Sequence, residues 1–82
     1  MPHFSVRLFA SAREQMGRDT VSLPLEHGST VSHLRSELER LAPDLAPLLS
    51  RCAIAVNRRY AEGDLTLQDG DEIALIPPVA GG

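Results

Sequence analysis

The N-terminal part of the chain alternates between apolar and polar positions. Phe4, Val6 and Leu8 share one face of the segment 3–9, and the same alternation returns in the segment 20–25. A period of two predicts strands with one buried face. The segment 10–16 between them favours a short helical turn that Gly17 closes. So short a connection predicts an antiparallel pair, with Pro24 in an edge strand.

A longer period follows in the middle of the chain. Apolar residues recur at spacings of three, four and three, at Val31, Leu34, Leu38 and Leu41. This stripe predicts an amphipathic helix that packs on a sheet. Thr30 is a suitable N-cap, and Pro43 ends the helix. Another short helical turn is predicted over 44–49.

The C-terminal half returns to short extended segments. An apolar strand is predicted over 52–56, then a turn at 57–59, a short strand beginning at Tyr60, an extended or 3₁₀ piece at 65–67, and a turn at 68–71. The final strand, 72–76, is almost continuously apolar, which favours a central place in the sheet. One main helix on a mixed sheet of four to five strands predicts an α+β roll.

The last six residues differ from this body of residues 1–76. Pro77-Pro78 cannot continue a central strand and favours an extended course. A flexible tail over 77–82 would reach roughly 20 Å, at about 3.3 Å per residue. Gly81-Gly82 has no Cβ and can pass through a narrow channel. The free carboxylate of Gly82 is therefore a candidate reactive group.

Composition limits the classes of function. Eighty-two residues form one domain with a small core, and a hydrophobic content of 43% is that of a globular protein. A net charge of −3 without a basic run argues against nucleic acid or an anionic membrane as partner. The chain has no apolar run long enough to span a membrane and no signal-peptide pattern, so we expect a cytoplasmic protein. Cys52, the single cysteine, is interpreted as a small core residue.

The sequence does not predict catalytic machinery of its own. His3, His27 and His33 lack metal-ligand spacing and are interpreted as surface residues, and no metal site is expected. No phosphate-binding loop or nucleophile elbow is present. Arg13-Glu14 and Arg58-Arg59 fit a partner contact or a solvated surface equally well. The sequence therefore favours a carrier whose C-terminal carboxylate is activated elsewhere, since adenylation and attack by sulfur would give a nucleophilic thiocarboxylate.

Three stretches resemble the small, sulfur-carrying subunits of molybdopterin synthase, a ubiquitin-like β-grasp family. They are Val6 to Glu14 with Gly17 following, Ala55-Val56-Asn57, and Leu67 to Gly82, which holds the DGDE turn and the PPVAGG end. The resemblance covers essentially the whole chain, and the last stretch is the most specific.

The resemblance implies a partner set and a role for the tail. An adenylyltransferase related to ubiquitin-activating enzymes would use ATP to activate Gly82, and a sulfur donor would complete the thiocarboxylate. The tail would enter the large synthase subunit in a heterotetramer, where sulfur passes to cyclic pyranopterin monophosphate and builds the dithiolene. The chain would bind no cofactor itself. Gly81 would belong to the reacting terminus with Gly82. The residues implied in partner binding are Phe9, Arg13, Ile76, Pro77, Pro78, Val79 and Ala80.

Two alternatives stay open. One is a sulfur carrier for the thiazole of thiamine or for tRNA thiolation, although the Phe-Ala…Arg-Glu pattern and Pro77-Pro78 favour molybdopterin synthase. The other is a ubiquitin-like protein modifier. The chain has no lysine, so it cannot form chains through its own side chains, but it could modify other proteins.

Overall fold

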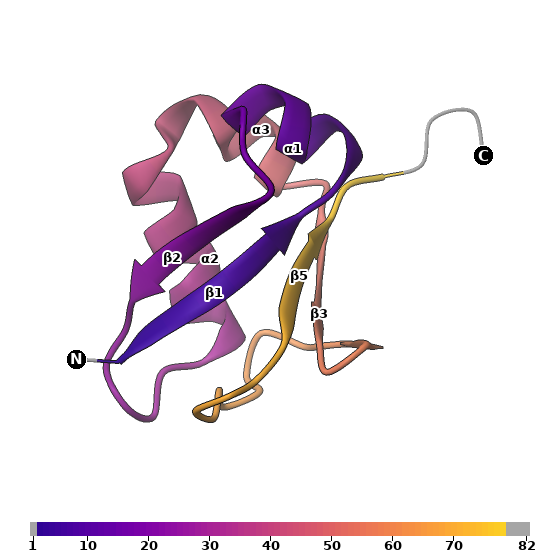
Figure 1. Cartoon of the computed structure of the whole chain (residues 1–82). Coiled ribbons are helices and arrows are strands. Elements are labelled where there is room, and N and C mark those ends of the chain that lie inside the picture. Colours follow the sequence, from indigo (N-terminus) through magenta and orange to yellow (C-terminus); the bar gives the residue numbers. More distant parts are fainter. Residues whose placement is uncertain (1, 79–82) are drawn as a thin grey trace.

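The computed structural model describes residues 2–78, and Figure 1 shows them as a twisted sheet with a long helix behind it and shorter helices at one end. The strands are β1 (His3–Leu8), β2 (Thr20–Pro24), β3 (Ala53–Val56), β4 (Arg59–Tyr60) and β5 (Ile73–Ile76). The helices are α1 (Ala10–Met16), α2 (Val31–Leu41), the 3₁₀ turn η1 (Pro43–Leu45) and α3 (Ala46–Leu49). These elements match the predicted ones to within one or two residues at their ends.

The sheet has five strands in the order β2-β1-β5-β3-β4. β1 pairs antiparallel with β2 and parallel with β5, while β5 pairs antiparallel with β3. The predicted α+β class and mixed sheet are therefore confirmed. The two predicted strand positions are also confirmed, because β5 is central and Pro24 lies in the edge strand β2.

The core lies between the sheet and α2. Alternate residues of β1 and β5 face it, and the buried stripe of α2 consists of Val31, Leu34 and Leu38. The prediction that Leu41 continues this stripe is wrong, since that residue is 48% exposed. Pro43 turns the chain into η1 directly after the helix, and Leu45 of that turn is buried in the core instead.

Local signals fix the ends of the helices. Gly17 adopts a left-handed conformation with φ of 71° and its N–H donates to the Arg13 carbonyl at 2.9 Å, as its predicted closing role requires. Thr30 caps α2 by accepting a hydrogen bond from the His33 backbone N–H. The imidazole of His33 returns the interaction, because its Nδ1 accepts from the Thr30 backbone N–H at 3.0 Å. This is a capping box with histidine in the place of glutamate.

The outer face of the sheet, opposite α2, carries apolar residues as well. In β5 only Ile73 and Leu75 are fully buried, whereas Ala74 and Ile76 are half-buried on the outer face. The almost continuous apolarity of this strand therefore has two causes. One set of side chains fills the core, and the other forms an apolar surface open to solvent.

The described chain leaves the sheet at Ile76, followed by Pro77, which is buried, and Pro78, which is exposed. The residues Val79, Ala80, Gly81 and Gly82 lie outside the described residues, so the predicted flexible tail stays a prediction. Within residues 2–78, no helix has the length and apolarity needed to cross a membrane. The same residues hold no cluster of three or more His, Cys, Asp or Glu side chains suited to a metal ion.

Candidate functional site

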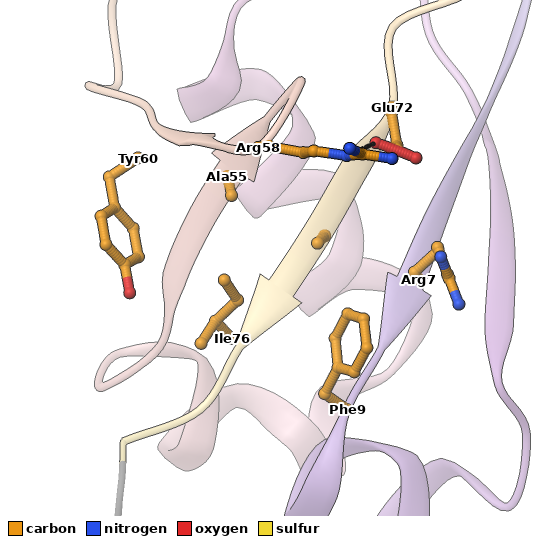
Figure 2. A pocket seen from close by; sticks show the side chains of 8 residues that line it. Arg7, Phe9, Ala55, Arg58, Tyr60, Glu72 and Ile76 are labelled. Atoms are coloured by element: carbon orange, nitrogen blue, oxygen red, sulfur yellow. Dashed lines mark hydrogen bonds and ion pairs between the residues drawn. The ribbon is translucent and has the colours of Figure 1, made fainter.

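A hollow of about 360 Å³ opens on the outer face of the sheet, beside the strand that leads to the C-terminus. Figure 2 shows the side chains around it. The residues that line this outer-face hollow are Arg7, Phe9, Ala55, Arg58, Tyr60, Glu72, Ala74 and Ile76. They come from three stretches of the sequence, 7–9, 55–60 and 72–76, which lie side by side in the sheet.

Strand register brings these residues together. Arg7 pairs with Ala74, which pairs with Ala55, and Ala55 pairs with Tyr60, so the four form one row across the outer face. The two alanines form the floor of the hollow because their side chains are short. Larger side chains stand on either side of this floor.

Aromatic and aliphatic side chains form the apolar part of the hollow. Phe9 is 40% exposed and Tyr60 is 76% exposed, so both aromatic rings present apolar surface to solvent. Figure 2 shows Ile76 between Phe9 and Tyr60, which lie on opposite sides of it. Exposed aromatic residues grouped around a concave apolar floor are typical of protein-binding surfaces.

Two arginines give the hollow its charge. The Arg7 Cζ lies 5.5 Å from the centre of the Phe9 ring, a cation–π distance. Arg58 Nε lies 3.3 Å from Glu72 Oε2, and Figure 2 marks this pair with a dashed line. Both partners of this pair are exposed, so it contributes at most about 1 kcal/mol to stability. Its main effect is to neutralise Arg58 at the rim.

The turn between β3 and β4 determines where Tyr60 lies. Asn57 and Arg58 both have positive φ, 53° and 70°, as a two-residue type I′ hairpin turn requires. The Asn57 side chain fixes this turn to the start of β5: its Oδ1 accepts from the Glu72 N–H, and its Nδ2 donates to Asp71 Oδ1, both at 3.0 Å. The turn therefore sets the register that puts Tyr60 on the outer face.

The predicted partner-binding residues are distributed over two places. Phe9 and Ile76 line the outer-face hollow, and Pro77 and Pro78 follow directly after it. Arg13 lies on α1 and does not line the hollow; its exposed side chain approaches Asp19, with Nε 4.0 Å from Oδ1. Val79, Ala80, Gly81 and Gly82 cannot be placed, because they lie outside the described residues.

Sequence reasoning did not identify Arg7, Tyr60 or the two alanines of the floor. Arg7 could have been assigned to this surface from the sequence, since the alternation of β1 puts it on the same face as Phe9. The face of Tyr60 depends on the length of the preceding turn, and Asn-Arg lacks the glycine that usually marks a type I′ turn. Of the ambiguous pair Arg58-Arg59, Arg58 lines the hollow, whereas Arg59 is exposed, pairs with Val56 and does not line it.

Cys52 lies apart from the hollow. Its side chain is only 7% exposed, which confirms the interpretation as a core residue. Burial raises the pKa of the Cys52 thiol above its ordinary value, although the charges of Arg35 and Arg51 act in the opposite direction. A protonated, buried thiol is a poor nucleophile.

Comparisons of the sequence with protein families and with known proteins point to the same group of proteins. The ThiS family model matches residues 6–82. The molybdopterin synthase sulfur carrier subunit of Dictyostelium discoideum is 35% identical over 83 residues, which cover 96% of this chain and 95% of that protein. Other curated relatives with this name are between 33% and 42% identical.

Solved structures give the same fold. SAMP1, small archaeal modifier protein 1, from Haloferax volcanii has a TM-score of 0.86 at 27% identity, covering 99% of this chain and all of that one. A chain in the complex of subunits 1 and 2 of molybdopterin-converting factor from Helicobacter pylori 26695 has a TM-score of 0.71 at 28% identity, with coverage of 99% and 100%. The chain therefore belongs to the ThiS family, among the ubiquitin-like β-grasp proteins that are molybdopterin synthase sulfur carrier subunits.

Proposed function

We propose that this chain carries sulfur on Gly82 and donates it, within a molybdopterin synthase, to cyclic pyranopterin monophosphate. The observation that carries the proposal is the similarity to sulfur carrier subunits over nearly the whole chain, at 33–42% identity. The complex from Helicobacter pylori supports a large-subunit partner, since one chain of that two-subunit complex resembles this chain. The proposed assembly is a heterotetramer of small and large subunits in the cytoplasm.

The chemistry follows from the carboxylate. An adenylyltransferase would let a Gly82 oxygen attack the α-phosphorus of ATP, and pyrophosphate would leave. Hydrosulfide from a donor would then attack the acyl carbon, and AMP would leave. The resulting thiocarboxylate is an anionic sulfur nucleophile near neutral pH. After sulfur has bonded to the acceptor, water would cleave the remaining acyl–sulfur bond and restore the carboxylate.

The folded domain would provide the surface that partners recognise. The outer-face hollow lies next to the strand from which the chain continues to Gly82, so a partner bound there also receives the tail. Phe9, Tyr60 and Ile76 supply the apolar contact area. Ala55 and Ala74 leave room for a side chain of the partner.

The decisive experiment mixes the Gly82-thiocarboxylate form with the large subunit of a molybdopterin synthase and cyclic pyranopterin monophosphate. Formation of the dithiolene product, absent with the carboxylate form of the same chain, is the expected result. No product from the cognate large subunit, when that subunit is active with the thiocarboxylate form of another carrier subunit, would contradict the proposal.

A second candidate function is protein modification, which the similarity to small archaeal modifier protein 1 favours. Its discriminating readout is an isopeptide bond between Gly82 and a lysine of another protein, detected by mass spectrometry. A carrier for thiamine or tRNA sulfur would instead transfer sulfur to those acceptors and not to the pyranopterin.

A further inference from the structure

Arg7 is an exposed charge without a counter-charge in the described part of the chain. Arg13, Arg40 and Arg58 each approach a carboxylate, and the guanidinium of Arg35 donates to two carbonyl oxygens. For Arg7 the only interaction found among residues 2–78 is that with the Phe9 ring.

The ring of Phe9 holds the Arg7 guanidinium beside the hollow. A guanidinium over an aromatic ring keeps the N–H donors at its edge available, so it can receive a carboxylate with two parallel hydrogen bonds. Arg7 lies in a central pair of strands, and the backbone under it is fixed by β2 on one side and β5 on the other. Little backbone freedom at Arg7 is therefore lost when a partner binds.

The charged side chains that line the hollow are those of Arg7, Arg58 and Glu72, so the hollow carries one net positive charge. Glu72 pairs with Arg58 at the rim, and the chain as a whole carries −3. A partner that covers the hollow must remove Arg7 from water. An uncompensated arginine would oppose this step, whereas a carboxylate of the partner would compensate it.

We propose that Arg7 is a specificity-determining residue of the docking surface, and that the large subunit presents a carboxylate to it next to an apolar side chain that enters the hollow. The proposal rests on the proposed function, because it assumes that the large subunit docks on this face. It assigns the two parts of recognition to different residues. Phe9, Tyr60 and Ile76 contribute contact area, and Arg7 contributes charge and orientation.

The test measures the affinity of the full chain for the large subunit, by isothermal titration calorimetry at low and at high salt. Arg7→Glu is expected to weaken binding about 30-fold or more, since a charge pair buried at an interface is replaced by repulsion. Arg7→Lys keeps the charge but loses the planar fork, so a smaller loss is expected. The wild-type affinity should also fall more steeply with salt than that of Arg7→Gln.

Arg18→Glu is the matched control, since it makes the same charge change at a residue that does not line the hollow. Its affinity should stay within about twofold of wild type, because a surface charge outside the interface contributes little. Thermal unfolding of each variant shows whether it folds, and Arg7→Gln replaces Arg7→Glu if the latter does not.

The outcomes separate this inference from the proposed function. Wild-type affinity in a folded Arg7→Glu or Arg7→Gln chain overturns the inference and leaves the proposed function standing. An equal loss in Arg18→Glu also overturns it, because the effect would then come from net charge. A wild-type chain that neither binds the large subunit nor supports product formation overturns both.

Discussion

At the scale of single residues, Cys52 matters because an activated Gly82 would react with any accessible thiolate. It is the only cysteine of the chain. Its side chain is buried between the end of α3 and the start of β3, and burial raises the pKa of the thiol. The fold therefore keeps the only internal thiol protonated and covered near neutral pH, away from the proposed chemistry at the terminus.

We expect Cys52 to resist thiol reagents in the native chain. At pH 7.5 its reaction with a disulfide reagent should be about 100-fold or more slower than in guanidinium chloride, because access requires a local opening of the core. Absorbance of the released thiolate measures both rates. A native rate close to the unfolded rate would contradict the buried position.

The raised pKa of Cys52 also predicts a pH dependence of stability. Because the folded-state pKa lies above the unfolded-state value, the stabilising contribution of the thiol is complete below about pH 8.5 and is lost as the pH rises from there toward the folded-state pKa. The difference in free energy of unfolding between wild type and Cys52→Ala should therefore shrink from pH 7 to pH 9.5. Urea denaturation of both chains at the two pH values measures it, and a constant difference would argue against the shift.

At the scale of elements, the capping box of α2 shows how two side chains fix the start of the main helix. Thr30→Ala should lower the free energy of unfolding by about 1 kcal/mol, because the His33 N–H loses its side-chain acceptor. His33→Gln should stay close to wild type, since glutamine also accepts from the Thr30 N–H. Urea denaturation gives these values. Ser36→Ala, at an exposed position of the same helix, is the control and should change stability by less than about 0.5 kcal/mol.

The elements themselves could be read from the sequence because each rests on a local signal. The period of two in β1 and β2, the period near 3.6 in α2, and Gly17, Pro24 and Pro43 are properties of neighbouring residues. Leu41 could not be placed correctly, because it ends the helix at 48% exposure while Leu45 of the following turn is buried in the core. Which of the two leucines is buried depends on tertiary packing, and helical periodicity does not reveal it.

The outer-face hollow was only partly predictable for the same reason. The family resemblance pointed to Phe9 and Ile76. The alternation of side chains along β1 also puts Arg7 on the same face as Phe9. The row from Arg7 to Tyr60 depends on strand order and register across four strands. A sequence without strand pairings predicts which residues are apolar, but not which of them meet on one face.

At the scale of the whole molecule, folding and the proposed chemistry use separate parts of the chain. The core consists of residues between Phe4 and Leu75, and the last strand ends at Ile76. Pro77 and Pro78 have no N–H, so they cannot extend the backbone ladder of β5. Changes at the terminus should therefore leave the stability of the body almost unchanged.

This separation predicts that a chain with one alanine added after Gly82, or with Gly81→Val, loses sulfur transfer but keeps its fold. The added residue would move the proposed reactive carboxylate by about 3.3 Å, and a valine side chain would obstruct the narrow partner channel proposed for the glycines. Product formation with the large subunit should fall by about 100-fold or more, because a 1 Å misplacement of reacting atoms already costs that much. The midpoint of thermal unfolding should stay within about 1 °C of wild type, and one alanine added before Met1 is the matched control. Full transfer by the extended chain, with the extra residue still present by mass spectrometry, would mean that the terminal carboxylate is not the working group, and the outer-face hollow would then have to serve another purpose.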